Sequence, residues 1–372
     1  MAKRKRSGKK TFLTVLLVFL LLIGGGAAVV FSLFRFQKDE PSNIPSDFVD
    51  VDPDEDISDG SGNVKKSLDI LSEVKGDNDL SSILKDWALN NTDNSLMYDN
   101  DVINILLLGI DEGGTNSDVI MLVSINQKTK KIFLSSIMRD SYTYITTGRS
   151  EGYGKINSAY ANGGSPCVVS TVQNDFKVRI DYYVTVNFNT FKAIVDQIGG
   201  VEVPVMEYEM IAMENLFTYG DSVLLNGDQA LMYCRIRYCD ADGDVSRTRR
   251  QRQFITALID RCRDLDVSQA ADVVSTLLKY VKTDCPTSKI LSYATKAVTG
   301  KWYNYDVIPI TLPTPDFRMD YMGYAWVWIV DYPPLAQYLQ DTVYEETNIK
   351  LTRDRVSAID VMRSRSTGEA RP

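Results

Sequence analysis

One segment of the chain gathers positive charge in a form that could bind a phosphorylated ligand. Residues 233–254 read YCRIRYCDADGDVSRTRRQRQF and contain six arginines among three aspartates. The planar guanidinium group binds phosphate oxygens through paired hydrogen bonds, and the first turn of a helix adds backbone donors to the same anion. This segment is therefore a candidate anion site.

A helix is expected to begin inside this segment. Ser246 is a residue type that caps helices, and the periodic pattern after it predicts a helix to about Leu265. One face of that helix carries Arg247, Arg250 and Gln251 first and apolar residues afterwards. The apolar turns should pack against the core, so the first turn should point towards the edge of the domain.

Two further arginines, Arg235 and Arg237, lie just before this helix. They would project from the same side if the chain is extended there, because alternate side chains of a strand share a face. The segment alone supports a second interpretation equally well, an internal network in which nearby aspartates neutralise the arginines. These aspartates are Asp240, Asp242 and Asp244.

A second candidate cluster follows from strand-like runs at 103–110, 119–126 and 131–137. In an antiparallel meander, the end of the first run, the start of the second and the end of the third meet at one edge. The residues at that edge are Asp111, Asp118, Arg139 and Asp140. Carboxylates beside phosphate favour Mg²⁺, which binds through one or two carboxylates plus phosphate oxygens. We therefore expect a magnesium-diphosphate site.

Composition excludes several kinds of chemistry. The 372 residues include no histidine, which rules out histidine-based catalytic triads and histidine-ligated zinc or iron. Proton transfer must then be carried by Asp, Glu, Lys, Tyr or Cys. Five cysteines are present without a CxxC motif, and a disulfide between Cys234 and Cys239 is one option that nothing in the spacing requires.

The N-terminus predicts a membrane anchor. Residues 1–10 contain six Lys or Arg, and residues 11–34 contain no charge. Such an apolar length spans a bilayer, and the positive-inside rule places the N-terminus in the cytoplasm. A cleaved signal peptide is the alternative, although its apolar region would be shorter. We expect a single-pass cell-membrane protein with an extracellular catalytic domain.

The rest of the chain is acidic, with 33 basic and 49 acidic residues after position 38. This charge disfavours nucleic acid as a partner. Residues 35–63 are rich in acids and poor in large apolar side chains, which predicts a disordered linker. The expected order continues with short accessory helices at 64–99, the main domain at 100–345 and a loose tail at 346–372.

Alternating helical and strand-like patterns across the main domain predict an α/β fold, a single layered domain in which helices flank a central mixed sheet. Helical patterns cover 155–164, 166–176, 189–200, 288–298 and 335–346, and a helix should also begin at Asn226. Strand-like patterns cover 180–188, 201–205 and 307–313. Apolar runs such as FITALI are typical of an ordinary core and do not by themselves indicate a lipid channel.

The motifs of this domain, in their order, resemble those of the LytR-CpsA-Psr family of bacterial cell-envelope proteins. They are LLLGID, SDVIMLVSIN, SSIMRDSY, KINSAYANGG, IDYYVTVNF, VDQIGGVEV, LNGDQALMYCRIR and GDVSRTRRQ. The resemblance covers roughly residues 100–345, and the predicted anchor and external domain are similar to the family's layout.

This resemblance implies a phosphotransferase that moves an anionic glycopolymer, such as teichoic acid or capsule, from a polyprenyl-pyrophosphate carrier to peptidoglycan. The residues implied at the diphosphate are Arg139, Arg235, Arg237, Arg247, Arg250 and Gln251. Those implied to hold Mg²⁺ or Mn²⁺ are Asp111 and Asp118. The implied catalytic residues are Asp118, Arg139, Asp140, Asp244 and Arg247, with Asp244 orienting Arg247 and either Asp118 or Asp140 accepting a hydroxyl proton.

Two rival functions stay open from the sequence. One is a non-catalytic polyprenyl-diphosphate binding or scaffold protein, and the other is a lipid pyrophosphatase that uses water as acceptor. A binder could retain the same arginines and carboxylates. Direct regulation of genes is disfavoured by the predicted anchor, by the acidity and by the lack of a DNA-binding motif.

Overall fold

The computed structural model describes residues 80–89, 96–111, 113–213, 218–237, 239–240, 243–263, 281–322, 326–345 and 357–366. The predicted basic N-terminus, membrane anchor and acidic linker lie outside these residues, as does part of the accessory region. No helix within the described ranges has both the length and the apolar character needed to cross a membrane.

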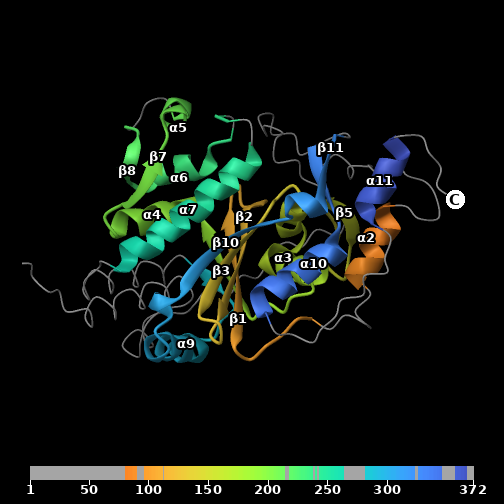
Figure 1. The fold of residues 1–372 in the computed structure, drawn as a ribbon, viewed down its shortest axis with the longest axis horizontal. Helices are drawn as coiled ribbons and strands as arrows, with labels where there is room; N and C mark the ends of the chain where they lie inside the picture. Colours follow the sequence, from red (N-terminus) through yellow and green to blue (C-terminus); the bar gives the residue numbers. More distant parts are fainter. Residues whose placement is uncertain are drawn as a thin grey trace, which may run out of the picture. The chain divides into compact units, whose positions relative to one another are not determined.

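The largest sheet has six strands in the order β10-β3-β2-β1-β6-β9 (Figure 1). They are β1 (Val102–Ile110), β2 (Ser117–Asn126), β3 (Lys131–Ile137), β6 (Tyr182–Asn187), β9 (Lys282–Thr283) and β10 (Asp306–Leu312). β1 and β2 are antiparallel, and the apolar side chains of β1 to β3 are mostly buried, as their Ile-, Leu- and Val-rich runs predict. The predicted α/β fold with a mixed sheet flanked by helices is confirmed.

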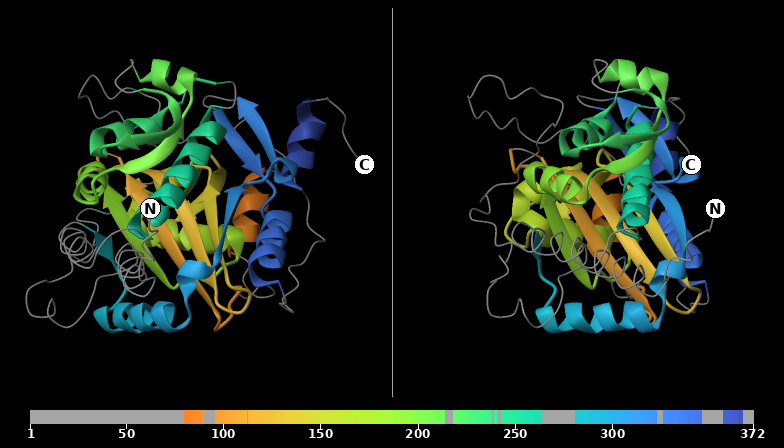
Figure 2. Two further views of the ribbon diagram at one scale, coloured as in Figure 1. Left: turned by 60° about the vertical axis from the view of Figure 1, so that its left-hand side comes forward. Right: turned by 90° about the vertical axis from the view of Figure 1, so that its left-hand side faces the viewer.

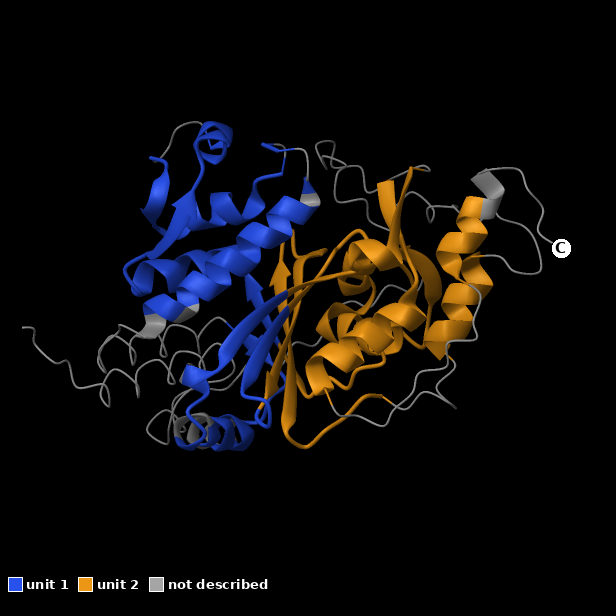
Figure 3. Ribbon diagram, viewed as in Figure 1, with its two compact units in different colours: residues 1–38, 127–134, 184–309 blue, residues 39–126, 135–183, 310–372 orange. Residues whose placement is uncertain are grey.

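The chain divides into two compact units, each made of separate stretches of sequence (Figure 3). Unit 1 comprises residues 1–38, 127–134 and 184–309, and unit 2 comprises residues 39–126, 135–183 and 310–372. Residues 100–345, predicted as one layered domain, contribute to both units. The cause is long-range packing, since residues after 310 fold back onto strands from the start of that range.

Unit 2 packs helices against its strands. Its helices are α2 (Leu80–Leu89), α3 (Ala159–Phe176), α10 (Tyr332–Tyr344) and α11 (Ala358–Ser366). Its hairpins pair β4 (Tyr142–Thr146) with β5 (Glu151–Lys155) and β11 (Arg318–Met322) with β12 (Trp326–Val330). α3 contacts α2 and α10. α3 is interrupted at Gly163 and Gly164, where Gly164 has φ of 63°, so the two predicted helical runs form on either side of the break.

The end of the described chain contains a helix where the sequence predicted a loose tail. α11 contacts α2 and β12 and buries Ala358, Ile359 and Met362. The Asp331 carboxylate holds its first turn by accepting hydrogen bonds from the Ser357 hydroxyl at 2.5 Å and the Ile359 N–H at 3.1 Å. The prediction was wrong here because three apolar residues form too weak a pattern and their partners are distant in sequence.

Unit 2 also encloses a buried carboxyl group. Asp175 in α3 accepts the hydrogen bond of the Thr143 hydroxyl at 2.8 Å. Burial raises the pKa of Asp175 to about 8, while the Thr143 hydrogen bond and the charge of Lys177 act in the opposite direction. Lys177 donates to the Trp87 carbonyl at 2.6 Å and lies 4.7 Å from the centre of the Trp87 ring. This buried cluster attaches α2 to the core of the unit.

Unit 1 is built from α4 (Phe188–Gln197), α6 (Gly227–Arg235) and α7 (Asp244–Arg263), and it also contains α9 (Thr287–Thr299). α7 packs on β7 (Val201–Val205), which pairs with β8 (Gly220–Leu225), and α5 (Glu207–Ala212) lies between those strands in sequence (Figure 2). Asn226 caps α6 as predicted, because its side chain accepts the Gln229 N–H at 3.0 Å. The Phe191 and Phe254 rings join α4 to α7 at 5.2 Å.

The start of α6 lies against α4 with no space for a side chain. The Gly227 N–H donates to the Asp196 carboxylate at 2.7 Å. A Cβ atom on Gly227 would lie 2.4 Å from the Lys192 carbonyl oxygen, well inside a van der Waals contact. The approach of the two helices therefore requires glycine at this position.

We predict that Asp175 makes stability fall as pH rises. Its pKa is about 8 in the folded chain against an ordinary value of 3.8, so the folded state alone holds this proton between those values. The free energy of unfolding should therefore drop by about 1 kcal/mol per pH unit across that window. Asp175→Asn cannot titrate and should lose this part of the slope in urea denaturation. Asp320→Asn, at an exposed carboxylate, should keep it, and equal slopes in the two variants would contradict the prediction.

We also predict that Gly227→Ala destabilises unit 1. The added methyl group meets backbone rather than a flexible side chain, so the free energy of unfolding should fall by about 1–3 kcal/mol or more. Asp228→Ala is the matched control, since the side chain of Asp228 is 79% exposed and pairs with Lys192 at 3.1 Å. It should cost less than about 1 kcal/mol. Denaturant midpoints of the two variants measure the difference.

Candidate functional site

Four charged side chains of unit 2 form a chain of ion pairs after the end of β3, and we call them the ion chain. Nη1 of Arg139 donates to Oδ1 of Asp118 at 2.6 Å, and Nε of Arg139 lies 3.6 Å from Oδ2 of Asp140. Oδ1 of Asp140 lies 3.0 Å from Nζ of Lys155. Of the four residues predicted to converge, Asp118, Arg139 and Asp140 are joined by these contacts, whereas Asp111 bonds within its own turn.

The members of the ion chain differ in their access to solvent. The side chains of Arg139, Asp140 and Lys155 are at most 4% exposed, whereas that of Asp118 is 23% exposed. Two cations and two carboxylates make the group neutral, which suits its burial because an unpaired charge there would be costly. Asp118 is therefore the member that a ligand reaches most easily.

Lys155 is a site residue that the sequence interpretation missed. It ends β5, and the next residue, Ile156, donates its N–H to the Ser141 carbonyl at 2.8 Å. This pairing sets Lys155 beside Asp140, which follows β3. A signal was present, because Lys155 opens the KINSAY motif, but its burial depends on β5 pairing with β4, and that pairing is not visible in local sequence.

Asp111 lies in the tight turn that joins β1 to β2. Its carboxylate accepts hydrogen bonds from the Thr115 N–H at 2.8 Å and the Thr115 hydroxyl at 3.0 Å, and the Asn116 amide nitrogen lies 3.5 Å away. These bonds hold the turn that leads into Asp118. Asp111 thus stabilises the turn between β1 and β2, and β2 carries Asp118 of the ion chain.

The donor set near this turn suits only certain metal ions. Across the described ranges, no group of three or more Cys, Asp or Glu side chains is arranged to hold a metal. A metal bound by Asp111 and Asp118 would therefore take most of its ligands from substrate and water. Magnesium binds in this way in many phosphate sites, so these carboxylates fit it.

Three arginines predicted at the diphosphate belong to unit 1, near the junction of α6 and α7. Arg235 is the exposed last residue of α6, and its guanidinium lies 4.8 Å from the centre of the Phe188 ring. Arg237 is half-buried and Arg247 is buried in the first turn of α7. The condition for Arg235 and Arg237 to project from one side, an extended chain, is not met, because α6 continues through Arg235. Asp244 begins α7, and its side chain is outside the described part.

The predicted face of the arginine helix is confirmed. α7 begins at Asp244, two residues before the expected start at Ser246. The residues expected to share its inner face are all buried, namely Arg247, Arg250, Gln251, Phe254 and Leu258. The Gln251 amide donates to the Cys234 carbonyl at 3.3 Å. The start of α7 is thereby held against the end of α6.

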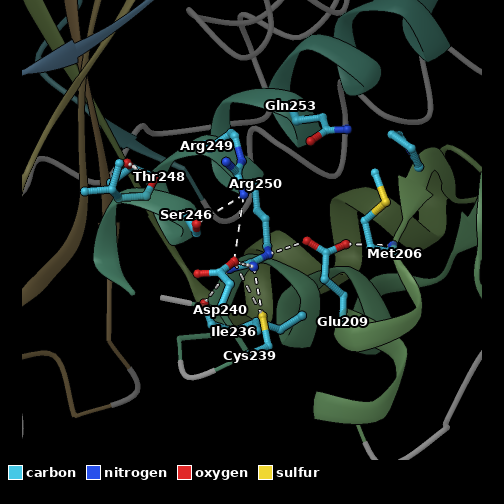
Figure 4. A network of polar contacts seen from close by, with 12 residues as sticks. Met206, Glu209, Ile236, Cys239, Asp240, Ser246, Thr248, Arg249, Arg250 and Gln253 are labelled. Atoms are coloured by element: carbon cyan, nitrogen blue, oxygen red, sulfur yellow. Dashed lines mark hydrogen bonds and ion pairs between the residues drawn. The ribbon is translucent and has the colours of Figure 1, made fainter. Parts of the chain in front are cut away.

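Arg250 belongs to an internal ion network (Figure 4). Its Nε donates to Oε1 of Glu209 and its Nη2 to Oδ2 of Asp240, both at 2.6 Å. Its Nη1 donates to the Ile236 carbonyl at 3.1 Å. The residue is 1% exposed. For Arg250, these contacts favour the internal Arg–Asp network over the predicted diphosphate contact.

Glu209, a second residue missed from sequence, joins α5 to α7. Its Oε2 accepts the Met206 N–H at 2.9 Å, so one carboxylate both caps α5 and binds Arg250. Burial disfavours the charged form of Arg250, but the hydrogen bond and charge of Glu209 and the charge of Asp240 leave its pKa raised. Glu209 is distant from Arg250 in sequence, so no local pattern could pair them.

The cysteines with described side chains are thiols. Cys234 and Cys239 are both free thiols, so the suggested disulfide between them is absent. Burial raises the pKa of Cys167 to about 12, and it also raises the pKa values of Cys234 and Cys239. A thiol held in its neutral form is a poor nucleophile. These residues are therefore packing residues.

Comparison with known proteins identifies the family. The model of the LytR_cpsA_psr family matches residues 70–342. The chain belongs to the LytR_cpsA_psr family. The resemblance seen in the motifs is thus confirmed, and the ion chain and the start of α7 both lie within the matched residues.

Individual relatives of this LytR_cpsA_psr protein are similar over part of its length. The polyisoprenyl-teichoic acid–peptidoglycan teichoic acid transferase TagU of Bacillus mycoides is 39% identical over 205 residues, which cover 54% of this chain and 66% of TagU. The match thus spans slightly less than two thirds of TagU.

Solved structures share the fold. TagT bound to LIIa-WTA has a TM-score of 0.55 and 26% identity, and the match covers 69% of this chain and 98% of TagT. Protein gbs0355 of Streptococcus agalactiae has a TM-score of 0.59 and 24% identity, over 69% of this chain and 92% of that chain, and shows the fold alone.

We predict that Arg250 of this LytR_cpsA_psr protein acts mainly in stability. Arg250→Ala leaves the buried Glu209 carboxylate without this cation, while Asp240 keeps Arg249 at 3.8 Å, so the free energy of unfolding should fall by about 3 kcal/mol. Arg249→Ala, at a side chain that is 51% exposed, should cost less than about 1 kcal/mol. Denaturation curves test this, and similar losses for the two variants would argue against a structural role for the network.

Proposed function

We propose that this chain is a phosphotransferase that moves an anionic glycopolymer from a polyprenyl-pyrophosphate carrier to peptidoglycan. The observation that carries the proposal is the ion chain at the end of β3, where a buried arginine meets a partly exposed carboxylate. Family membership supports it, since the relative TagU is a polyisoprenyl-teichoic acid–peptidoglycan teichoic acid transferase. Teichoic acid is the favoured glycopolymer, and capsule is the alternative.

The proposed reaction joins two polymers through a phosphodiester. A sugar hydroxyl of peptidoglycan attacks the phosphorus on the glycan side of the diphosphate and forms a new P–O bond. The bond from that phosphorus to the bridging oxygen breaks, and polyprenyl phosphate leaves with the bridging oxygen. Positioning and charge neutralisation do most of the work in such transfers.

Arg139 is the proposed phosphate ligand of the ion chain. Asp118 and Asp140 hold its guanidinium on two sides, which fixes its orientation before a substrate arrives. A guanidinium held in this way costs little reorganisation when charge develops on the phosphate oxygens. The other proposed diphosphate ligands, named for their positions in the family's motifs, are Arg235, Arg237, Arg247 and Gln251. Asp244 is proposed to orient Arg247.

Charge balance supports a requirement for Mg²⁺ or Mn²⁺. A bound diphosphate would bring further negative charge against the Asp118 and Asp140 carboxylates. A divalent cation held by Asp111 and Asp118 would neutralise the diphosphate and polarise its oxygens.

Asp118 is the better of the two proposed acceptors for the hydroxyl proton. Asp140 is enclosed between Arg139 and Lys155, with 4% of its side chain exposed. Asp118 contacts Arg139 through one oxygen and is 23% exposed, so its other oxygen has more access to a sugar hydroxyl. Asp140 and Lys155 would then position Arg139 from behind.

The cellular location is part of the same proposal. The apolar segment at 11–34 would anchor the chain in the cell membrane and leave the catalytic units outside, where both polymers are found. The acidic residues 35–63 would act as a spacer.

Arg139→Ala should sharply lower the rate of transfer, and thermal melting of the variant separates loss of the phosphate ligand from loss of the fold. The full chain in detergent micelles would be incubated with a polyprenyl-diphosphate glycan and peptidoglycan oligomers, with Mg²⁺ or EDTA, and the joined product measured by mass analysis. We expect a metal-dependent product whose rate falls by about 10²–10³-fold in the variant, the effect of losing one preorganised donor. Arg179→Ala, an exposed arginine of unit 2 stacked on Tyr98, is the control and should retain activity.

The rival functions give different results in the same assay. Tight lipid binding without product, using several glycans, would support a binding or scaffold protein. Release of phosphorylated glycan into water without joined product would support a pyrophosphatase. Product formation that is unaffected by both EDTA and Arg139→Ala would overturn the proposal.

A further inference from the structure

The hairpin of β11 and β12, whose first strand is labelled in Figure 1, carries an aromatic face that has no role in the proposed reaction so far. Its register places Asp320 opposite Trp328 and Met322 opposite Trp326. Opposite residues of an antiparallel pair share a face, so these four side chains lie together. The other face carries Val327 and Ile329, which are buried. The hairpin is therefore two-sided, with one face in the core and one that reaches solvent.

The outward face has an ordered aromatic arrangement. The Trp326 and Trp328 rings are 4.6 Å apart and 75° from parallel. The guanidinium of Arg318 lies 4.3 Å from the centre of the Trp328 ring and donates to the Pro313 carbonyl at 3.2 Å. Both indoles are partly exposed, and Met322 beyond them is 71% exposed. Rings held by such contacts offer a binding surface that is already formed.

This face is attached directly to the strand connection that carries Arg139. The backbone N–H of Trp328 donates to the backbone carbonyl of Asp140, the residue after Arg139, at 2.9 Å. Nη1 of Arg318 lies 2.8 Å from the sulfur of Met138, the residue before Arg139. The hairpin thus contacts both sequence neighbours of Arg139, within unit 2. A ligand on the indoles would lie close to the ion chain.

We propose that the outward face of this hairpin binds the glycan strand of the peptidoglycan acceptor, with Trp326 as its main contact. The inference rests on the proposed transfer function. One side of a pyranose ring exposes a row of C–H bonds, and this apolar surface packs on an indole ring. The Asp320 carboxylate, exposed beside Trp328, can accept hydrogen bonds from sugar hydroxyls.

Charge distinguishes the acceptor from the donor polymer at this face. The donor glycopolymer is anionic, so its repeated phosphates would meet the Asp320 carboxylate and the negative faces of two indoles. The guanidinium of Arg318 lies over the Trp328 ring and its charge balances that of Asp320, so the face offers no excess positive charge to bind a polyanion. The amino-sugar backbone of peptidoglycan is N-acetylated and uncharged. The face therefore suits the acceptor strand.

The test measures acceptor binding separately from transfer. The full chain in detergent micelles would be titrated by calorimetry with undecorated peptidoglycan oligomers and, in a second arm, with soluble anionic glycopolymer. Trp326→Ala should raise the Kd for peptidoglycan oligomers about tenfold, which corresponds to about 1.4 kcal/mol. Its affinity for glycopolymer should stay unchanged, and Trp326→Phe should restore part of the acceptor affinity because it keeps a ring.

A matched control removes an aromatic ring elsewhere in unit 2. Tyr98 is 46% exposed and has the Arg179 guanidinium 4.3 Å from its ring, an arrangement like that of Arg318 on Trp328. Tyr98→Ala should leave the peptidoglycan Kd unchanged. Thermal melting of each variant would show whether a change in binding comes from loss of the fold.

Each outcome decides the inference. A tenfold loss for peptidoglycan alone supports it. A loss for glycopolymer alone would assign the face to the donor, and unchanged binding in folded Trp326→Ala would show that another occupant covers it; both results overturn the inference. Because binding is measured without transfer, wild-type binding that depends on Trp326 but yields no product would refute the proposed function and keep the sugar-binding face.

Discussion

The ion chain of Asp118, Arg139, Asp140 and Lys155 is the constraint on which the proposed site depends. A buried arginine can stay charged in unit 2 only because two carboxylates neutralise it, and the more deeply buried of these is itself neutralised by a lysine. The four residues come from β2, from the turn after β3 and from the end of β5. These contacts form only when all three strands are in register, so the packing that folds unit 2 also orients Arg139.

Pairing with carboxylates also decides the roles of the arginines of unit 1, but these arginines differ in how far they are enclosed. Arg250 is fully enclosed by carboxylates and a carbonyl, and its role is to hold α5, the turn before α7 and α7 itself together. Arg235, at the end of α6, is exposed and contacts an aromatic ring instead. One arginine-rich segment therefore contains both structural and accessible cations, and composition alone could not separate them. Burial and the number of hydrogen bonds do separate them.

The β11–β12 hairpin links the ion chain to a surface that a polymer could use. Its inner residues, Val327 and Ile329, pack in the core of unit 2, and its backbone bonds to Asp140. The outward tryptophans are thereby fixed by the same contacts that stabilise the fold. A transfer enzyme must bring a second, bulky substrate to a buried phosphate ligand. A rigid aromatic face beside that ligand offers one physical means of doing so.

The sequence by itself determined strands β1 to β3, β6, β7 and β10, the main helices and the charged residues at the strand ends, because each depends on local periodicity, capping or turn chemistry. It did not indicate the β4–β5 and β11–β12 hairpins or β8. The runs at β1 to β3, the Asn226 cap and the buried face of α7 all follow from spacing within a few residues. The contact between Asp118 and Arg139 was predicted from the antiparallel order of β1, β2 and β3. Only the tertiary structure decided that Lys155 completes the ion chain, that Glu209 encloses Arg250, and that α11 packs on α2. The residues in each of these contacts are far apart in the chain, or their local pattern is too weak to indicate a partner. The contacts stabilise the protein only in the desolvated environment that folding creates.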